Sequence, residues 1–226
     1  MKELCLEGVT RWFRSEKLVL NRINLTVEKP EAVLIIGSAG SGKTALFQII
    51  SKQTVPDEGI VKINGRMALV CEELPFMSGL CVEDYIFLPL MLLGNKKKAI
   101  RPEVGYAMKR SGLWAKKDMK TETLSAYDKC RLMLAMAMIQ DPDIIVMEQC
   151  QKHLTKEDGA QFWQFARTWI KEKKVALICF SDKDIEAGLF NTRYLLSNGN
   201  LEELNTNEKN SFMCGSYHFS SSPSPE

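Results

Sequence analysis

A glycine-rich segment that ends in lysine and threonine is the part of the chain best suited to hold phosphate. It matches the pattern G-x-x-x-x-G-K-[ST] and reads Gly37, Ser38, Ala39, Gly40, Ser41, Gly42, Lys43 and Thr44. Glycines let the backbone curl so that successive N–H groups point at phosphate oxygens. Lys43 offers a charge for the terminal phosphates and Thr44 a hydroxyl for Mg²⁺. The segment therefore predicts a site for a nucleoside triphosphate.

The flanking residues predict the elements that must position this segment. The apolar run Ala32–Ile36 predicts a strand covered on both faces. Residues 45–52 predict a helix that turns Leu46, Ile49 and Ile50 inward. A strand–loop–helix order is the context that the motif requires, and the helix adds its positive N-terminal end. The alternative, a glycine- and serine-rich turn without a ligand, is disfavoured by the complete pattern in this context.

Composition and charge exclude several other classes of protein. The 226 residues suit one domain with or without a subdomain, and a net charge of +2 gives no reason to expect a nucleic-acid partner. The N-terminal residues do not form a signal-peptide pattern, and no apolar run approaches the ~18 residues that cross a bilayer. A membrane role is therefore expected through a partner. Seven scattered cysteines without a C-x-x-C pair indicate reduced thiols rather than a zinc site.

The rest of the chain predicts an α/β fold. Strands are expected at 4–9, 18–27, 60–63, 66–72, 144–147 and 175–180, with a closing hairpin at 194–201. Residues 82–140 predict helices, one carrying Val104, Met108 and Leu113. Thr155 is expected to cap a helix that carries Phe162, Phe165, Trp169 and Ile170. The polar tail, residues 205–226, is expected to be disordered.

Taken in order, these pieces resemble the ATP-binding-cassette (ABC) ATPases over residues 3–204. Phe13 stands where that family stacks an aromatic ring on adenine, and residues 124–131 (LSAYDKCR) where its signature L-S-G-G-Q-x-x-R stands. Residues 141–149 (DPDIIVMEQ) match its second nucleotide motif, and 175–182 its switch strand. The resemblance implies a P-loop NTPase fold with an ABC-type β-subdomain and a helical subdomain inserted at about 82–140.

The resemblance also implies ligands and partners. They are ATP and Mg²⁺, an integral-membrane transporter subunit, and a second nucleotide-binding subunit in a homo- or heterodimer. The expected location is cytoplasmic, on the inner face of the membrane. The segment 82–94 is similar to ATPases of lipoprotein release, macrolide export, cell division and lipid trafficking. However, the link between Gly65 and Met67 is short for that group, so the subfamily is an open question.

Outside the phosphate loop, the positions that the family uses for catalysis have changed. Glu148 replaces the Asp near Mg²⁺, and Glu72 replaces a Mg²⁺-sensing glutamine. Gln149 replaces the glutamate that acts as general base, and Ser181 replaces the switch histidine. An amide binds water but cannot take its proton at neutral pH. These changes predict a degenerate ATPase.

The signature segment has changed as well. Only Ser125 survives as a ligand for the γ-phosphate of the other subunit, because both glycines are replaced, by Ala126 and Tyr127. We expect Tyr127 to obstruct the close backbone approach and Asp128 to place a negative charge toward phosphate. Residues 152–155 (KHLT) likewise differ from the family's S-A-L-D.

Three hypotheses follow from this pattern. The first is a subunit that binds ATP, hydrolyses little or none, and has a structural or regulatory role. The second is a transport ATPase that hydrolyses slowly through the substituted residues. The third is an interaction module that no longer binds nucleotide. The membrane partner is expected near residues 72–85, where Leu74, Pro75, Phe76 and Met77 form an apolar patch or simply pack in the core.

Overall fold

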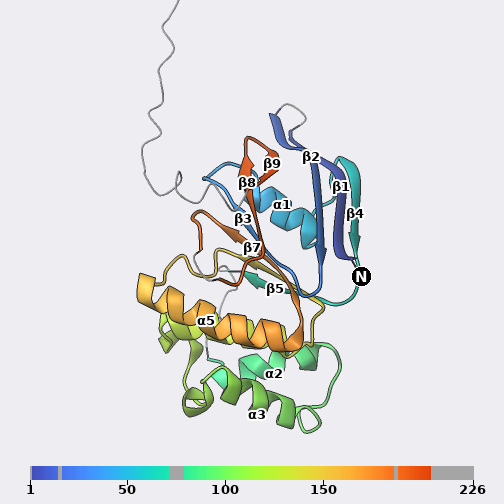
Figure 1. Cartoon of the computed structure of the whole chain (residues 1–226). Helices are drawn as coiled ribbons and strands as arrows, with labels where there is room; N and C mark the ends of the chain where they lie inside the picture. The colour runs from blue at the N-terminus through green and yellow to red at the C-terminus, as the bar shows by residue number, and fades with distance from the viewer. Residues whose placement is uncertain (1, 15–16, 72–78, 186–187, 205–226) are drawn as a thin grey trace, which may run out of the picture.

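In the computed structural model, the described residues are 2–14, 17–71, 79–185 and 188–204. They form two sheets and a layer of helices (Figure 1). The smaller sheet is antiparallel, in the order β2–β1–β4, and contains β1 (Lys2–Phe13), β2 (Lys17–Glu28) and β4 (Glu58–Ile63). Its first two strands are longer than the sequence predicted, because each continues past the apolar residues into the turn that joins them.

The larger sheet has the strand order β5–β6–β7–β3–β8–β9. Its strands are β3 (Ala32–Ile36), β5 (Met67–Cys71), β6 (Ile144–Glu148), β7 (Ala176–Ser181), β8 (Thr192–Ser197) and β9 (Asn200–Glu203). All neighbours run parallel except β8 and β9, which form the predicted hairpin. Ile36 lies opposite Ser181, and Glu148 opposite Phe180. The register therefore brings the loops after β3, β6 and β7 to one edge.

Helix α1 (Lys43–Ile50) lies between the two sheets (Figure 1). Its Leu46, Ile49 and Ile50 are buried, as predicted, in a core shared with both sheets. Burying side chains of this size stabilises the fold by about 1.5–3 kcal/mol each. The phosphate-loop segment is therefore fixed at both ends, by β3 in the centre of the sheet and by α1 in this core.

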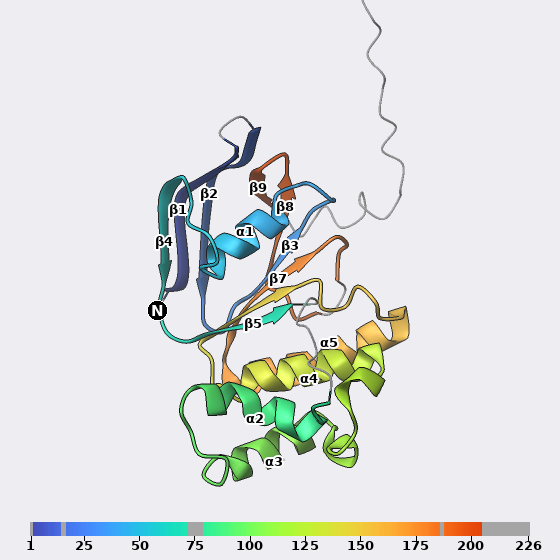
Figure 2. The same ribbon diagram turned by 180° about the vertical axis from the view of Figure 1, so that it is seen from behind.

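The remaining helices lie on the other side of the larger sheet from α1 and share one core with it (Figure 2). They are α2 (Val82–Leu92), α3 (Arg101–Arg110), α4 (Ala126–Met138) and α5 (Lys156–Lys173), with 3₁₀ turns at Trp114–Lys116 and Thr121–Thr123. Thr155 caps α5 as predicted, its hydroxyl accepting from the N–H of Asp158 at 3.1 Å. One detail was wrong: Leu113 lies beyond the end of α3, although it is buried.

Some predictions fall outside the described residues. They concern Glu72, the apolar patch at 74–77 and the tail at 205–226. In the described part of the chain, no helix is both long and apolar enough to cross a bilayer. Of the six described cysteines, Cys130, Cys150 and Cys179 are buried.

Asp143 ties the turn before β5 to the start of β6, and its pKa predicts a pH-dependent contribution to stability. Its carboxylate pairs with Lys29 and accepts from the N–H of Arg66 at 2.6 Å. The hydrogen bond from Lys29 is the main cause that lowers the pKa of Asp143 below its usual 3.8. The contribution is therefore present above pH 3.8 and is lost as the pH falls through the lowered folded-state value.

We expect Asp143→Asn to lower the free energy of unfolding by about 1–2 kcal/mol near neutral pH, a value reduced for partial exposure of the ion pair. The difference from the unsubstituted protein should shrink in acid, where the native carboxyl is also protonated. Urea unfolding at neutral and acidic pH measures this, with the exposed Glu122→Gln as control. A difference that stays constant with pH would contradict the assignment.

Candidate nucleotide-binding site

The loop between β3 and α1 has the geometry of a phosphate cradle. Gly40 and Gly42 have φ values of 78° and 108°, in the left-handed region that glycine adopts without strain. A Cβ at Gly42 would lie 2.9 Å from the carbonyl oxygen of Val19, and one at Gly37 2.7 Å from that of Leu196. These contacts explain why both positions require glycine. The Ser41 hydroxyl is buried in this loop and has no hydrogen-bond partner among the described residues.

Lys43 folds back over the loop that precedes it. Its ammonium group donates to the carbonyl oxygens of Gly37 at 2.5 Å and Ser38 at 2.9 Å. It also forms an ion pair with Asp182 at 2.7 Å. The Lys43 side chain is only 5% exposed, whereas that of Asp182 is 46% exposed. A buried positive charge at the start of α1 is thus available to an anion that displaces Asp182.

Thr44 and Glu148, two of the residues predicted to hold Mg²⁺, are in contact. The Thr44 hydroxyl donates to a Glu148 carboxylate oxygen at 3.1 Å, which joins the start of α1 to the end of β6. In the described residues no three acidic, histidine or cysteine side chains cluster as a metal site. Mg²⁺ usually keeps several waters and takes only one or two protein ligands beside phosphate. The Thr44–Glu148 pair therefore fits Mg²⁺ held together with a nucleotide. The predicted third residue, Glu72, is not among the described ones.

Gln149 follows the end of β6, and Ser181 is the last residue of the neighbouring strand β7. Gln149 follows β6 with a φ of 50°, and its N–H donates to the carbonyl of Phe180 at 3.1 Å. Ser181 ends β7 and is buried, and its carbonyl accepts from the N–H of Gly37 at 3.1 Å. The Ser181 hydroxyl accepts from the N–H of Lys183 at 3.2 Å, so it is engaged in its own loop. Ser181 contacts the phosphate loop through its carbonyl, and neither residue supplies a strong base.

Comparison with known proteins decides the family. The model of the family described as ABC transporter matches residues 20–150, which is more than half of the chain. The chain belongs to the ABC transporter family. The matched range contains the phosphate loop, the signature segment and the second nucleotide motif at 141–149. The P-loop NTPase fold with its ABC-type β-subdomain and helical insertion is thereby confirmed.

Individual relatives agree with this assignment. The chain is 30% identical over 154 residues to the methionine import ATP-binding protein MetN 2 of Paraburkholderia xenovorans, covering 61% of this chain and 40% of that protein. It is 24% identical to the ABC transporter ATP-binding protein YtrE of Bacillus subtilis, covering 83% and 89%. CbiO1 of Clostridium perfringens, part of the complex cbiONQ, superposes with a TM-score of 0.81 at 19% identity, covering 88% and 86%. The chain spans about half the length of several curated relatives that it matches.

Phe13, the predicted adenine platform of this ABC protein, ends β1. Its ring is 59% exposed, and the Arg14 guanidinium carbon lies 5.2 Å from the ring centroid. An exposed aromatic face is what stacking on a base requires. The structure leaves the ring accessible, and its role in binding adenine stays a prediction.

The signature segment is arranged differently from the prediction. Ser125 caps α4, which lies among the helices on the other side of β5 from α1 (Figure 2). Its hydroxyl accepts from the N–H of Asp128 at 3.1 Å and donates to the Asp128 carboxylate at 3.0 Å. Asp128 is 4% exposed and pairs with Lys116 and, at 3.6 Å, with Arg131. The expectation that Asp128 places its charge toward phosphate was therefore wrong, because two cations hold it inward.

Tyr127 is also held by neighbouring side chains. Its half-buried ring packs against the helical core, and the Arg131 guanidinium carbon lies 4.9 Å from the ring centroid. Arg131 stacks on Tyr127 and pairs with Asp128, so it holds the side chains of both replacement residues against α4. Sequence reasoning missed this role of Arg131 and the pairing of Lys43 with Asp182. The i,i+3 spacing of Asp128 and Arg131 was the available signal for the first.

The Lys43–Asp182 ion pair is expected to oppose nucleotide binding. The phosphate must displace the Asp182 carboxylate, which already neutralises Lys43. After it is displaced, the nearby Asp182 carboxylate repels the phosphate. We expect Asp182→Asn to bind Mg-ATP about twofold to fivefold more tightly, the range for a partly exposed ion pair. Fluorescence titration measures the change. Asp184→Asn is the matched control, since Asp184 lies two residues on and pairs with Arg193. Unchanged or weaker binding by Asp182→Asn would refute this role.

Proposed function

We propose that this chain is the nucleotide-binding subunit of a membrane ABC-type complex, and that it binds ATP with little or no hydrolysis. Its role is then structural or regulatory. The observation that carries this proposal is the hydrogen bonding of Ser125 to Asp128. Ser125 is the one residue kept from the family's γ-phosphate ligands in the signature. Its hydroxyl already accepts one hydrogen bond from Asp128 and donates another to it.

The phosphate-loop side of the site supports retained binding. Lys43, Thr44 and the left-handed glycines keep the elements that hold phosphate and Mg²⁺. Bound Mg²⁺ would neutralise phosphate charge, and Thr44 and Glu148 are the residues that would hold it. The nucleotide would gain the Lys43 charge and the N-terminal end of α1. Apart from Glu148, these contacts need none of the residues that have changed for catalysis.

The strand ends beside the loop support loss of turnover. A Gln149 amide can hydrogen-bond the attacking water but cannot accept its proton. The short Ser181 hydroxyl, turned toward Lys183, does not replace an imidazole. Losing a general base costs roughly 10²–10⁴-fold in rate. In the family's head-to-tail dimer each site combines the loop of one subunit with the signature of the other. Pairing with an active paralogue would therefore damage both sites.

The expected partners are an integral-membrane transporter subunit and a second nucleotide-binding subunit, with the chain on the cytoplasmic face of the membrane. The relatives' names support a transport complex, as they include import ATP-binding proteins for methionine and for molybdate/tungstate. We place the nucleotide-binding domain at 1–204. No nucleic-acid partner is proposed. The substrate and the subfamily stay open.

The test is to measure binding and turnover on the same preparation. Equilibrium binding of Mg-ATP at millimolar concentration should be detectable, while steady-state phosphate release stays at the level of the Lys43→Ala variant. Phosphate release at an ordinary transporter's rate, lost in that variant, would instead establish a working ATPase. No detectable ATP binding would favour an interaction module.

A further inference from the structure

The turn between α2 and α3 presents apolar and basic side chains together at the surface. Met91, Leu92 and Leu93 are 45%, 79% and 67% exposed. Lys96, Lys97 and Lys98 follow and are all exposed. From residue 91 to residue 101 the sequence contains four basic residues and no acidic one. We call residues 91–98 the α2 tip.

The α2 tip is held in one conformation by its backbone. The N–H and the side-chain amide of Asn95 both donate to the carbonyl of Leu90, at 3.2 and 2.9 Å. The N–H of Gly94, at a φ of 84°, donates to the carbonyl of Met91 at 2.9 Å. Ile100 is buried and anchors the end of the turn. Because the backbone of the turn is already ordered, little backbone conformational entropy is lost when its side chains bind a surface.

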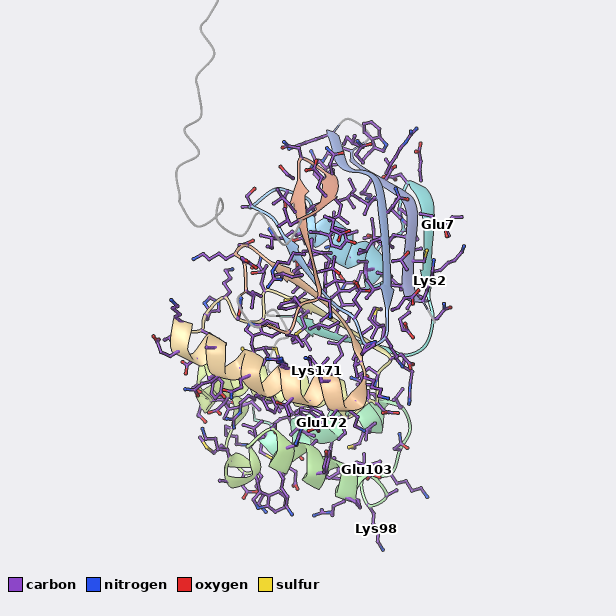
Figure 3. The ribbon with its side chains drawn as sticks, in the orientation of Figure 1. Lys2, Glu7, Lys98, Glu103, Lys171 and Glu172 are labelled. Carbon is purple, nitrogen blue, oxygen red and sulfur yellow. The ribbon has the colours of Figure 1, made fainter. Side chains whose placement is uncertain are left out.

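Of the three lysines in the tip, Lys97 forms an ion pair within the described part of the protein and the other two do not. Lys97 pairs with Asp84 at 3.0 Å, and its ammonium lies 4.7 Å from the centroid of the Phe87 ring. Lys96 and Lys98 form no ion pair with a described residue, and Figure 3 shows Lys98 extending away from the protein. Lys96 and Lys98 thus carry positive charge next to the exposed leucines.

We propose that the α2 tip binds directly to an anionic lipid bilayer. The apolar side chains would enter the boundary between headgroups and acyl chains, and the lysines would contact anionic headgroups. A small tip that projects from the helical layer suits a flat membrane surface. A stable protein interface needs about 800 Å² from each partner, more than one short turn offers. This inference does not depend on whether the chain hydrolyses ATP.

The experiment is flotation of the purified full chain with vesicles, without nucleotide. One set contains phosphatidylcholine alone, and the other contains about one-third phosphatidylglycerol to provide the surface charge on which the lysines act. We expect binding to the anionic set that weakens with added salt, and much less binding to the neutral set. The variants are Leu92→Ser with Leu93→Ser, and Lys96→Gln with Lys98→Gln. Each lysine removed should weaken binding about fivefold, the equivalent of about 1 kcal/mol.

Matched controls separate the tip from general surface properties. Val55→Ser with Ile60→Ser removes two exposed apolar side chains elsewhere, where Val55 is 77% and Ile60 51% exposed. Lys17→Gln with Lys171→Gln makes the same change in net charge at exposed sites. Both controls should bind vesicles like the unsubstituted chain, and thermal melting verifies that every variant is folded. The proposal is overturned if the unsubstituted chain does not float, or if tip and control variants bind equally.

Discussion

Replacing Lys43 with alanine is expected to reduce the affinity for Mg-ATP by at least about 30-fold. The ammonium is almost buried at the start of α1, so water screens its attraction for phosphate only weakly. Removing one partner of such a desolvated charge pair costs about 2–5 kcal/mol. At about 1.4 kcal/mol per factor of ten, 2 kcal/mol already gives the 30-fold loss. Equilibrium titration with a fluorescent ATP analogue measures it.

The control for this variant is Lys171→Ala, which removes the same charge from an exposed position on α5 (Figure 3). It should leave affinity unchanged, whereas a general charge effect would weaken both variants. Thermal melting tests whether Lys43→Ala is folded, because its loss also leaves the carbonyls of Gly37 and Ser38 without the lysine as donor. A folded Lys43→Ala protein that keeps full affinity would mean that nucleotide binds elsewhere or not at all.

The phosphate site could be predicted from the sequence because its parts are local. The glycines, Lys43 and Thr44 lie within eight consecutive residues, and the apolar run before them fixes the strand. The backbone geometry follows from residue type, as the positive φ values at Gly40 and Gly42 illustrate. The resemblance to the ABC ATPases then predicted where the second nucleotide motif and the switch strand lie along the chain.

The pairing of Lys43 with Asp182 and of Asp128 with Lys116 could not be predicted, because each contact joins residues from separate elements of the fold. Asp182 reaches Lys43 only because β7 and β3 are neighbours in the sheet. Asp128 turns inward because Lys116, twelve residues earlier, is brought back to it by the turn that precedes α4. A sequence pattern identifies a carboxylate but not the direction in which it points. Ion pairs with Lys116 and Arg131 hold the Asp128 carboxylate inward, so it does not point in the predicted direction.

Restoring both halves of the catalytic site should raise ATP turnover by at least about 10²-fold over the unsubstituted chain. The restored variant carries Gln149→Glu and Ser181→His in one half and Ala126→Gly, Tyr127→Gly and Asp128→Gln in the other. The first half returns a base and an imidazole, and the second frees the Ser125 hydroxyl from the Asp128 carboxylate. Each group is worth roughly 10²-fold or more where it acts in the transition state.

The two halves are expected to be strongly non-additive, and this separates our proposal from slow catalysis by the substituted residues. Gln149→Glu with Ser181→His alone should gain little, because the opposing signature still cannot reach phosphate. Restoring the signature alone should gain little without a base. Lys116 is 40% exposed and can be hydrated when Asp128 is replaced, so the signature variant should fold. Lys43→Ala in the restored background should abolish the gain. A folded, ATP-binding restored protein that stays inactive would show that these departures do not limit turnover.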